Sequence, residues 1–394
     1  MNKKILIVSA IYYPYHLGGA EISTQLLAEG LAKSFEVSVV THNLTNCVEK
    51  LNGVTIFRRN FGLGSRLVIN EINNKKNSSF SKFISKLKDI FNNKKSAKVF
   101  SNLINEIKPN CIVFSGNCFR MGRRTLISVA NCLHLKQVFI IRDPSLLYFK
   151  SLRESFSFLD NWYRRKNIKL LKSMDSVIGI SNDILQAHIN SGFIFKNPCV
   201  VPNIIDNNDS FYLKPSEKKK NILYVGMLSK NKGVDFLISS FLKNTILPPE
   251  TKLILIGGNV DINIPKNDCI INLGKLDLLT TYKIMSENYV VVLPSIWKEA
   301  FGRVLVEASF NSTIAIGSKS GAIPELMNYD NDFLFDVLDE NCLLSKLRHI
   351  FSLSFYEYEE NVKKQHQYFE QYNSESVCKK MEFALCDIFK EETK

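Results

Sequence analysis

Short β-branched runs that alternate with helical patterns are the feature that most constrains the fold of this sequence. The runs lack a polar face, and strands of that kind are buried on both sides of a sheet. Alternation of such strands with helices indicates parallel sheets covered by helices. We therefore expect an α/β protein. The runs cover residues 4–10, 36–43, 111–116, 137–143, 176–181, 221–226, 252–258, 290–295 and 313–318.

A linker divides this series. Residues 200–221, VVPNIIDNNDSFYLKPSEKKKN, are rich in Pro, Asn, Asp and Lys, which favours a loop. A chain of 394 residues is also too long for one ordinary core. The net charge changes from +17 over residues 1–200 to −4 over residues 201–394. We predict two Rossmann-like domains, 1–202 and 203–375, and a C-terminal helix over 376–394 that packs back on the first domain.

Composition excludes several classes of protein. Hydrophobic residues make up 45% of the chain, which favours a globular protein over a disordered one. The nine cysteines have no CxxC spacing, so neither a disulfide framework nor a zinc ribbon is expected, and a reducing cytosol is favoured. The N-terminus reaches Pro14 too early for a signal peptide. No run approaches the ~18 apolar residues of a membrane span. We expect a cytoplasmic protein, soluble or peripheral on the inner face of the plasma membrane.

A lysine-rich segment, residues 75–100, leaves two interpretations open. Its apolar residues have helical spacing, and its lysines lie mostly off that face. The helix is then either a membrane-surface element or a surface helix whose apolar face joins the core. The stretch WYRRKNIKLLK, residues 162–172, favours the membrane. No nucleic-acid-binding motif accompanies the charge. The apolar residues are Phe80, Phe83, Ile84, Leu87 and Phe91, and the lysines are Lys82, Lys86, Lys88, Lys94, Lys95 and Lys98.

Candidate binding residues follow the strands. Ligands of open α/β sheets lie beyond the carboxyl ends of strands, where helix N-termini present free N–H groups. Gly18 and Gly19 follow the first strand and permit close backbone approach. Lys230 and Lys232 precede Gly233 and a helix, which suits a phosphate. No GxGxxG motif is present, so a nicotinamide dinucleotide is poorly supported.

The segment KEAFGRVLVEASF, residues 298–310, places Glu299 before a helix start and Glu307 inside the helix, with Gly302 between them. Backbone N–H groups at the helix start suit a phosphate, while carboxylates accept hydrogen bonds from hydroxyl groups. A nucleotide sugar offers a diphosphate between a ribose diol and sugar hydroxyls. The arrangement therefore predicts a nucleotide-sugar site, although a solvated surface pair of carboxylates is the ordinary alternative.

Five motifs in order resemble the retaining glycosyltransferases of family 4, which have the GT-B fold. They are GGAE (18–21), VPNIID (201–206), VGMLSKNKG (225–233), PSIWKEAFGRVLVEA (294–308) and SGAIPEL (320–326). The resemblance implies two Rossmann-like domains facing across a cleft, and no metal or other cofactor. It implies that Glu307 binds the ribose diol, Glu299 faces the donor sugar and Lys232 neutralises the leaving diphosphate.

The resemblance also implies the wider set of site residues. The catalytic group comprises Glu299, Lys232, Arg142 and Asp143. The donor-binding group comprises Gly226, Lys230, Lys232, Phe301, Gly302, Arg303, Val304 and Glu307, and the acceptor or phosphate loop comprises Gly18 and Gly19.

Two departures from the family pattern affect this site. Met227 stands where an arginine is usual in the phosphate loop, so one diphosphate cation is missing and Lys230 is its candidate replacement. Arg142-Asp143 stands where the family usually has a histidine followed by aspartate, so the histidine contact to the sugar is absent.

The expected function is retaining transfer of a hexose-type sugar from a UDP- or GDP-sugar to a saccharide acceptor. The basic first half suits a lipid-diphosphate-linked acceptor at an anionic membrane surface, as in the synthesis of surface polysaccharide. The alternatives are a GT-B nucleotide-sugar epimerase and a non-catalytic nucleotide-sugar-binding protein. Nucleic acid is not an expected partner.

Overall fold

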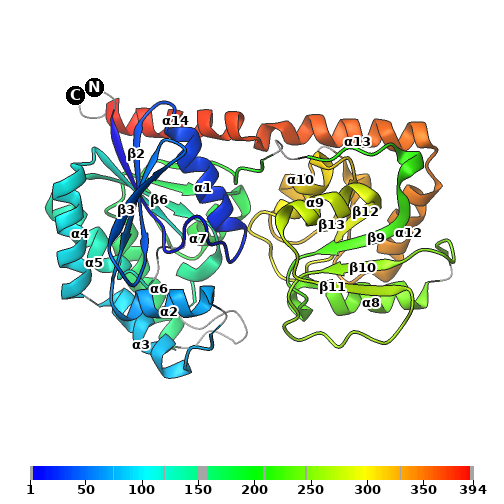
Figure 1. Ribbon diagram of the computed structural model, residues 1–394, viewed down its shortest axis with the longest axis horizontal. Coiled ribbons are helices and arrows are strands. Elements are labelled where there is room, and N and C mark those ends of the chain that lie inside the picture. Colours follow the sequence, from blue (N-terminus) through cyan, green and yellow to red (C-terminus); the bar gives the residue numbers. More distant parts are fainter. Residues whose placement is uncertain are drawn as a thin grey trace. The chain divides into compact units, whose positions relative to one another are not determined.

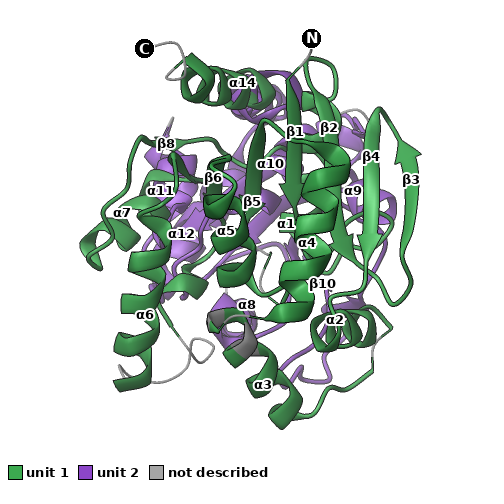
Figure 2. Cartoon of the chain, turned by 90° about the vertical axis from the view of Figure 1, so that its left-hand side faces the viewer, with its two compact units in different colours: residues 1–204, 377–394 green, residues 205–376 purple. Residues whose placement is uncertain are grey.

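The computed structural model describes residues 3–73, 75–91, 93–116, 118, 120–148, 158–206, 210–244, 246–328 and 330–390. The chain forms two compact units (Figure 2). Unit 1 comprises Met1–Ile204 and Val377–Lys394, and unit 2 comprises Ile205–Ser376. Each unit is built around its own sheet. No helix within the described residues is both long and apolar enough to cross a membrane.

Unit 1 contains an eight-stranded sheet in the order β3-β4-β2-β1-β5-β6-β7-β8. All neighbours are parallel except β3 and β4, which form an antiparallel hairpin at one edge. Sequence patterning did not predict that hairpin because β3 is largely exposed and carries polar residues. The strands are β1 (Lys4–Val8), β2 (Glu36–His42), β3 (Cys47–Leu51), β4 (Val54–Arg59), β5 (Cys111–Ser115), β6 (Lys136–Ile141), β7 (Ser176–Gly179) and β8 (Pro198–Val200).

Helices lie on both faces of this sheet, with α4 and α5 on one side and α1 on the other (Figure 1). The central strands are therefore apolar on both faces, and Ile5, Val39 and Val113 are at most 1% exposed. Asn93 begins α4 by accepting hydrogen bonds from Lys95 N and Ser96 N. The helices are α1 (Gly19–Leu31), α2 (Leu63–Ile72), α3 (Ser79–Ile90), α4 (Lys94–Ile107), α5 (Arg123–Cys132), α6 (Phe158–Leu171), α7 (Asn182–Asn190) and α14 (Ser374–Lys390), with the short 3₁₀ helix η1 (Pro144–Leu146).

The last helix, α14, belongs to unit 1 from Val377 onward. Its Phe389 ring lies 6.5 Å from the Phe35 ring, and Lys3 Nζ lies 5.0 Å from the Phe389 centroid. The last turns of α14 thus pack on unit 1 beside the starts of β1 and β2 through aromatic and cation–π contacts.

Unit 2 contains a six-stranded, wholly parallel sheet in the order β11-β10-β9-β12-β13-β14. The strands are β9 (Lys219–Val225), β10 (Leu253–Ile256), β11 (Ile270–Gly274), β12 (Asn288–Leu293), β13 (Ile314–Ser318) and β14 (Leu334–Phe335). Helices α9 and α10 lie on one side of the sheet and α8 on the other (Figure 1). The longer elements of its helical layers are α8 (Val234–Lys243), α9 (Leu278–Glu287), α10 (Arg303–Phe310), α12 (Glu340–Ser352) and α13 (Phe355–Phe369).

Candidate active site

Three loops of unit 2 meet at the carboxyl edge of its sheet. They follow β9, β12 and β13, which are neighbours in the sheet, so their carboxyl ends lie side by side. The loops are the phosphate loop (residues 226–233), the motif loop (294–302) and the loop 319–322 before the short helix α11 (Ile323–Leu326). This is the edge at which ligands of parallel α/β sheets bind.

Two glycines permit the loops to pack backbone against backbone. Gly233 has φ +69°, and a Cβ there would lie 1.9 Å from the Pro294 carbonyl oxygen. Gly321 has φ +58°, and a Cβ there would lie 2.3 Å from the carbonyl oxygen of Glu299. Any side chain would collide at either position, because the neighbouring atoms are backbone. The glycines of KNKG and SGAIPEL therefore position the motif loop.

Hydrogen bonds hold the same contacts. The Asn231 carbonyl of the phosphate loop accepts from Ile296 N at 3.1 Å and from Trp297 N at 2.9 Å. On the other side of the motif loop, Ala322 N donates to the Glu299 carbonyl at 2.8 Å. The backbone of Glu299 is thus fixed by the loop after β13 and not only by its own helix.

The side chain of Glu299 forms an ion pair with Lys232. Lys232 Nζ lies 2.6 Å from Glu299 Oε1, and the buried hydroxyl of Ser295 donates to the same oxygen. The two charged side chains are 25% and 12% exposed, so the pair is partly withdrawn from water. Two of the predicted catalytic residues therefore lie in direct contact.

The second glutamate of the motif is paired with an arginine one helical turn earlier. Gly302, with φ +103°, lies immediately before α10. Arg303 is the first residue of α10, and its Nη2 lies 3.0 Å from Glu307 Oε1. Glu307 is 9% exposed, and Arg303 Nε and Nη2 both contact its Oε1. The carboxylate is held in one orientation, and its Oε2 faces no hydrogen-bond donor among the described residues.

Phe301 and Val304 support the helix start in different ways. Phe301 is 5% exposed and its ring packs edge-on against Tyr372 at 5.4 Å. Its side chain is thus part of the core of unit 2, and its backbone is what remains for a ligand. Val304 is half-buried in the first turn of α10.

The phosphate loop has an exposed rim. Met227 is 59% exposed and Lys230 is exposed, whereas Lys232 is half-buried. Gly226 takes φ +148°, and the Met227 carbonyl accepts from the Tyr224 hydroxyl at 2.7 Å. Burial, followed by the nearby Glu299 carboxylate, raises the pKa of Tyr224 above its usual range. The neutral phenol therefore supports the loop as a hydrogen-bond donor.

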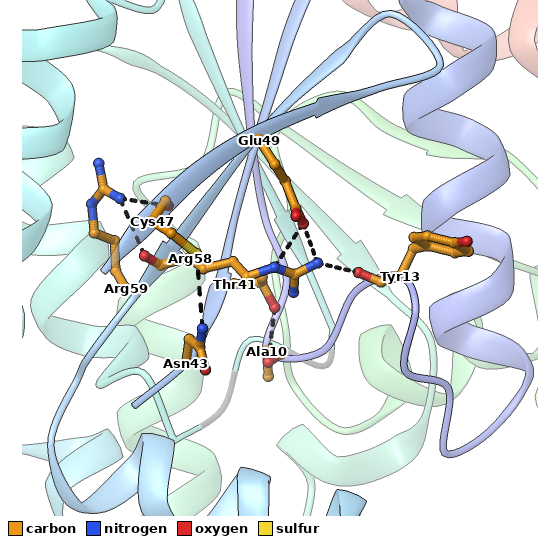
Figure 3. Close-up of polar contacts among 8 residues, drawn as sticks. All are labelled: Ala10, Tyr13, Thr41, Asn43, Cys47, Glu49, Arg58 and Arg59. Atoms are coloured by element: carbon orange, nitrogen blue, oxygen red, sulfur yellow. Dashed lines mark hydrogen bonds and ion pairs between the residues drawn. The ribbon is translucent and has the colours of Figure 1, made fainter. Parts of the chain in front are cut away.

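Four predicted site residues belong to unit 1. Gly18 is exposed and lies directly before α1, where its N–H donates to Glu21 Oε2 at 2.9 Å. Gly19 begins that helix. The loop before them is tied to the sheet by Arg58, whose guanidinium contacts Glu49 and the Tyr13 carbonyl (Figure 3).

Arg142 and Asp143 follow β6 in the same unit. Arg142 is 8% exposed, its Nε donates to Ser115 Oγ at 3.2 Å, and its Nη1 donates to Asn203 Oδ1. Asp143 is exposed and caps η1 by accepting from Ser145 N at 2.8 Å. Both residues therefore make hydrogen bonds that stabilise the structure of unit 1, and these bonds explain in part why the two residues stand at these positions.

Sequence reasoning missed several residues that shape these sites. Ser295 and Gly321 contact Glu299, Tyr224 supports the phosphate loop through the Met227 carbonyl, and Ser115 and Asn203 hold Arg142. Only Gly321 had a signal, since a glycine after a strand suggests a close backbone approach. No group of three or more His, Cys, Asp or Glu side chains in the described residues is placed to hold a metal ion.

Comparison with known proteins decides the family. The model of the group 1 glycosyl transferases matches residues 206–368, which include the whole glutamate motif. A 42.6 kDa protein of Klebsiella pneumoniae from a cps region is 31% identical over 340 residues, or 82% of this chain and 87% of that protein. The chain belongs to glycosyltransferase family 4.

Solved structures show the GT-B fold of this family. Sucrose-phosphate synthase from Thermosynechococcus elongatus matches with a TM-score of 0.73 at 16% identity, over 99% of this chain and all of that chain. HepE from Anabaena, in complex with UDP and glucose, matches with a TM-score of 0.69 at 16% identity, over 98% of this chain and all of that chain. The predicted GT-B architecture of two parallel-sheet domains is confirmed. This glycosyltransferase belongs to a family of retaining hexosyltransferases.

Proposed function

We propose that this glycosyltransferase moves a hexose-type sugar from a UDP- or GDP-sugar to a saccharide acceptor and retains the anomeric configuration. One observation carries the proposal. The start of α10 lies between two carboxylates of fixed orientation, one held by Lys232 and Ser295 and the other by Arg303. A diphosphate between a ribose and a sugar has the matching order of groups.

The donor-binding roles follow from this order. Glu307 accepts hydrogen bonds from the ribose diol, since Arg303 binds its Oε1 and leaves Oε2 without a partner among the described residues. Backbone N–H groups of Gly302 and Arg303 bind the diphosphate at the helix start. Glu299 accepts from hydroxyl groups of the donor sugar, and Lys232, with Lys230 at the exposed rim, neutralises the diphosphate.

The proposed chemical step is a front-face displacement. The bond between C1 of the sugar and the β-phosphate oxygen breaks while the acceptor oxygen bonds to C1 on the same face. The acceptor proton passes to the departing phosphate oxygen, and the nucleoside diphosphate leaves. Lys232 meets the growing negative charge of the leaving group, which stabilises the transition state more than the bound donor.

The acceptor is proposed to be a lipid-diphosphate-linked saccharide used in capsule or other surface polysaccharide synthesis at the cytoplasmic face of the plasma membrane. The Klebsiella relative comes from a cps region, and the structurally similar HepE was solved with UDP and glucose. The +17 charge of residues 1–200 suits an anionic acceptor. Gly18, Gly19, Arg142 and Asp143 are the acceptor-side and catalytic residues proposed in unit 1.

The test is a donor screen followed by product analysis. Thermal-shift measurements against UDP-, GDP-, ADP- and CMP-sugars identify the donor, and turnover with lipid-linked saccharide acceptors identifies the reaction. NMR of the product should show the same anomeric configuration as the donor. Interconversion of the donor sugar without an acceptor would instead indicate an epimerase, and binding without any turnover would indicate a nucleotide-sugar-binding protein.

A further inference from the structure

Helix α3 buries two polar residues and exposes two of its phenylalanines. Ser85 and Asp89 are each 3% exposed, whereas Phe80 is 72% and Phe83 47% exposed. Ile84 and Leu87 are half-buried. A helix on a globular protein ordinarily buries its apolar stripe. The interpretation in which these phenylalanines join the core is therefore wrong for Phe80 and Phe83. The side chains of Lys86 and Lys88 lie outside the described residues.

A buried ion pair explains this orientation. Asp89 Oδ2 lies 2.9 Å from Arg123 Nη2, and Asp89 Oδ1 accepts from Arg123 N at 2.7 Å. Arg123 Nη2 also donates to the Tyr163 hydroxyl of α6 at 3.0 Å. Rotation of α3 to bury its phenylalanines would separate the pair and leave a buried charge unpaired, which is strongly unfavourable. The ion pair fixes which side of α3 faces outward.

The exposed side of α3 continues onto α6. Phe91, 54% exposed, directly follows α3, and its ring lies 6.2 Å from the ring of Trp162. Phe158 and Leu159 in the first turn of α6 are 83% and 46% exposed. Figure 2 shows α3 and α6 projecting at the same end of unit 1. We call this surface the α3–α6 face; it comprises Phe80, Phe83, Phe91, Phe158, Leu159 and Trp162.

The segments that form the α3–α6 face are rich in basic residues. Residues 75–98 contain eight lysines and one acidic residue, Asp89, which is buried in the ion pair. The exposed lysines of this segment include Lys82, Lys94, Lys95 and Lys98, and the exposed basic residues of α6 include Arg165 and Lys169. Large apolar side chains beside many cations suit an anionic lipid surface, where the rings enter the interface and the lysines meet headgroups. A second copy of this chain that bound through the same face would place one basic surface against another, and this repulsion disfavours self-association.

We infer that the α3–α6 face docks this enzyme on an anionic lipid bilayer. The inference rests on the proposed function only for the purpose of docking, which is to bring unit 1 to a lipid-linked acceptor. Lipid binding itself requires neither donor nor turnover. The inference is therefore measured separately from the reaction.

The experiment is co-sedimentation of the full chain with vesicles. We expect the wild type to pellet with phosphatidylcholine–phosphatidylglycerol vesicles at low salt and to stay in solution with pure phosphatidylcholine. Lys82→Gln, Lys94→Gln and Lys95→Gln together should weaken binding by about fivefold per lysine, and added salt should weaken wild-type binding in the same way. Phe80→Ser with Phe83→Ser should weaken binding by roughly tenfold or more at every salt concentration.

Phe383→Ser is the matched control. Phe383 is 67% exposed on α14, which lies at the opposite end of unit 1 from α3 (Figure 1). Its replacement should leave vesicle binding unchanged. Absence of wild-type binding, or equal loss in the control and the Phe80/Phe83 variant, would overturn the inference. A concentration-dependent dimer that the Phe80/Phe83 variant abolishes, without vesicle binding, would assign the face to self-association instead.

Nucleotide affinity distinguishes this inference from the proposed function. Both face variants should show the same thermal shift with the donor nucleotide as the wild type, since none of the replaced residues belongs to the three loops of unit 2 that form the candidate donor site. Vesicle binding by a protein that transfers no sugar would leave the inference standing and remove the proposed reaction.

Discussion

Lys232 Nζ lies 2.6 Å from Glu299 Oε1, and both side chains are mostly buried. Because the proposed donor needs Lys232 for its diphosphate and Glu299 for its sugar, a bound donor competes with the ion pair for both residues. Ser295 also donates to Glu299, so the carboxylate keeps a partner when the lysine turns to a phosphate. The pair thus links diphosphate binding to the placement of the sugar.

Replacing Glu299 with glutamine should separate these two roles. The variant loses the anion that holds Lys232, so its affinity for free UDP or GDP should stay the same or rise. The turnover number should fall by about 10- to 100-fold, the equivalent of one lost charge-assisted hydrogen bond to the sugar. Calorimetry with the free nucleotide and initial-rate kinetics measure the two effects. Loss of free-nucleotide binding would reverse the proposed orientation of the donor.

Lys232→Ala should lower the turnover number more than the donor affinity, since the leaving diphosphate gains charge as the bond breaks. Lys230→Ala is the matched control, because Lys230 lies in the same loop but is exposed. It should have a much smaller effect. An equal loss of turnover in both variants would mean that Lys230 neutralises the leaving diphosphate as strongly as Lys232 does.

Glu307→Gln should remove the discrimination between a ribose and a deoxyribose. We expect the wild type to bind UDP or GDP more tightly than the 2′-deoxy form, since a carboxylate–hydroxyl hydrogen bond contributes about 1.5–3 kcal/mol. In the variant the two affinities should converge. Calorimetry with both nucleotides measures the difference. Equal affinities already in the wild type would contradict the assignment of Glu307 to the ribose.

Asp89→Ala should destabilise unit 1 by about 3–5 kcal/mol, because it leaves the buried Arg123 guanidinium without its carboxylate. Asp89→Leu combined with Arg123→Met should recover much of that loss, since it removes both charges. Urea denaturation followed by circular dichroism measures the change. Lys363→Ala provides the comparison at an exposed ion pair with Glu360 and should leave stability almost unchanged, because water screens the pair. A double variant as unstable as Asp89→Ala would point to lost packing in place of an unpaired charge.

Lys218 should make the stability of unit 2 depend on pH. Burial lowers the pKa of this lysine to about 7, below the unfolded value of about 10.4. The unfolded chain therefore binds a proton that the folded chain has released between these values. The contribution of Lys218 to the free energy of unfolding is complete above the unfolded pKa and is lost as the pH falls through about 7. Between these two pKa values it changes by about 1.4 kcal/mol per pH unit.

Denaturation of the wild type and of Lys218→Met from pH 7 to pH 9 measures this contribution. As the pH rises from 7 to 9, the free energy of unfolding of the wild type should increase relative to that of Lys218→Met. Lys218 Nζ also donates to the Ser286 carbonyl and, at 3.1 Å, to Thr313 Oγ1. A difference that does not change with pH would mean that these acceptors keep the ammonium charged.

Sequence patterns predicted the central strands because a strand buried on both faces consists of consecutive apolar residues. All nine predicted runs contain a strand, from β1 at Lys4–Val8 to β13 at Ile314–Ser318. The edge strands β3, β8 and β14 were not predicted, since they are short or face water and so carry no continuous apolar signal. Strand β4 was also missed, although most of it is buried.

The sequence also predicted the candidate residues of the nucleotide-sugar site, because Glu299, the helix start and Glu307 lie close together along the chain. The contacts that these residues make with one another were not predicted. Lys232 reaches Glu299 across 67 positions of the chain, and Gly321 supports the Glu299 backbone from the next strand. Such contacts depend on the order of strands in the sheet, which local periodicity does not contain.

The outward face of α3 shows the same division. Its sequence determined an amphipathic helix with phenylalanines on one side and lysines mostly off it. Which side faces water depended on Arg123 of α5, which pairs with Asp89 in the interior and also donates to the Tyr163 hydroxyl of α6. The hydrophobic pattern alone favours burial of the phenylalanines, and only the tertiary structure contains the buried ion pair that opposes it, because an interaction between distant charges forms only after the helices have packed.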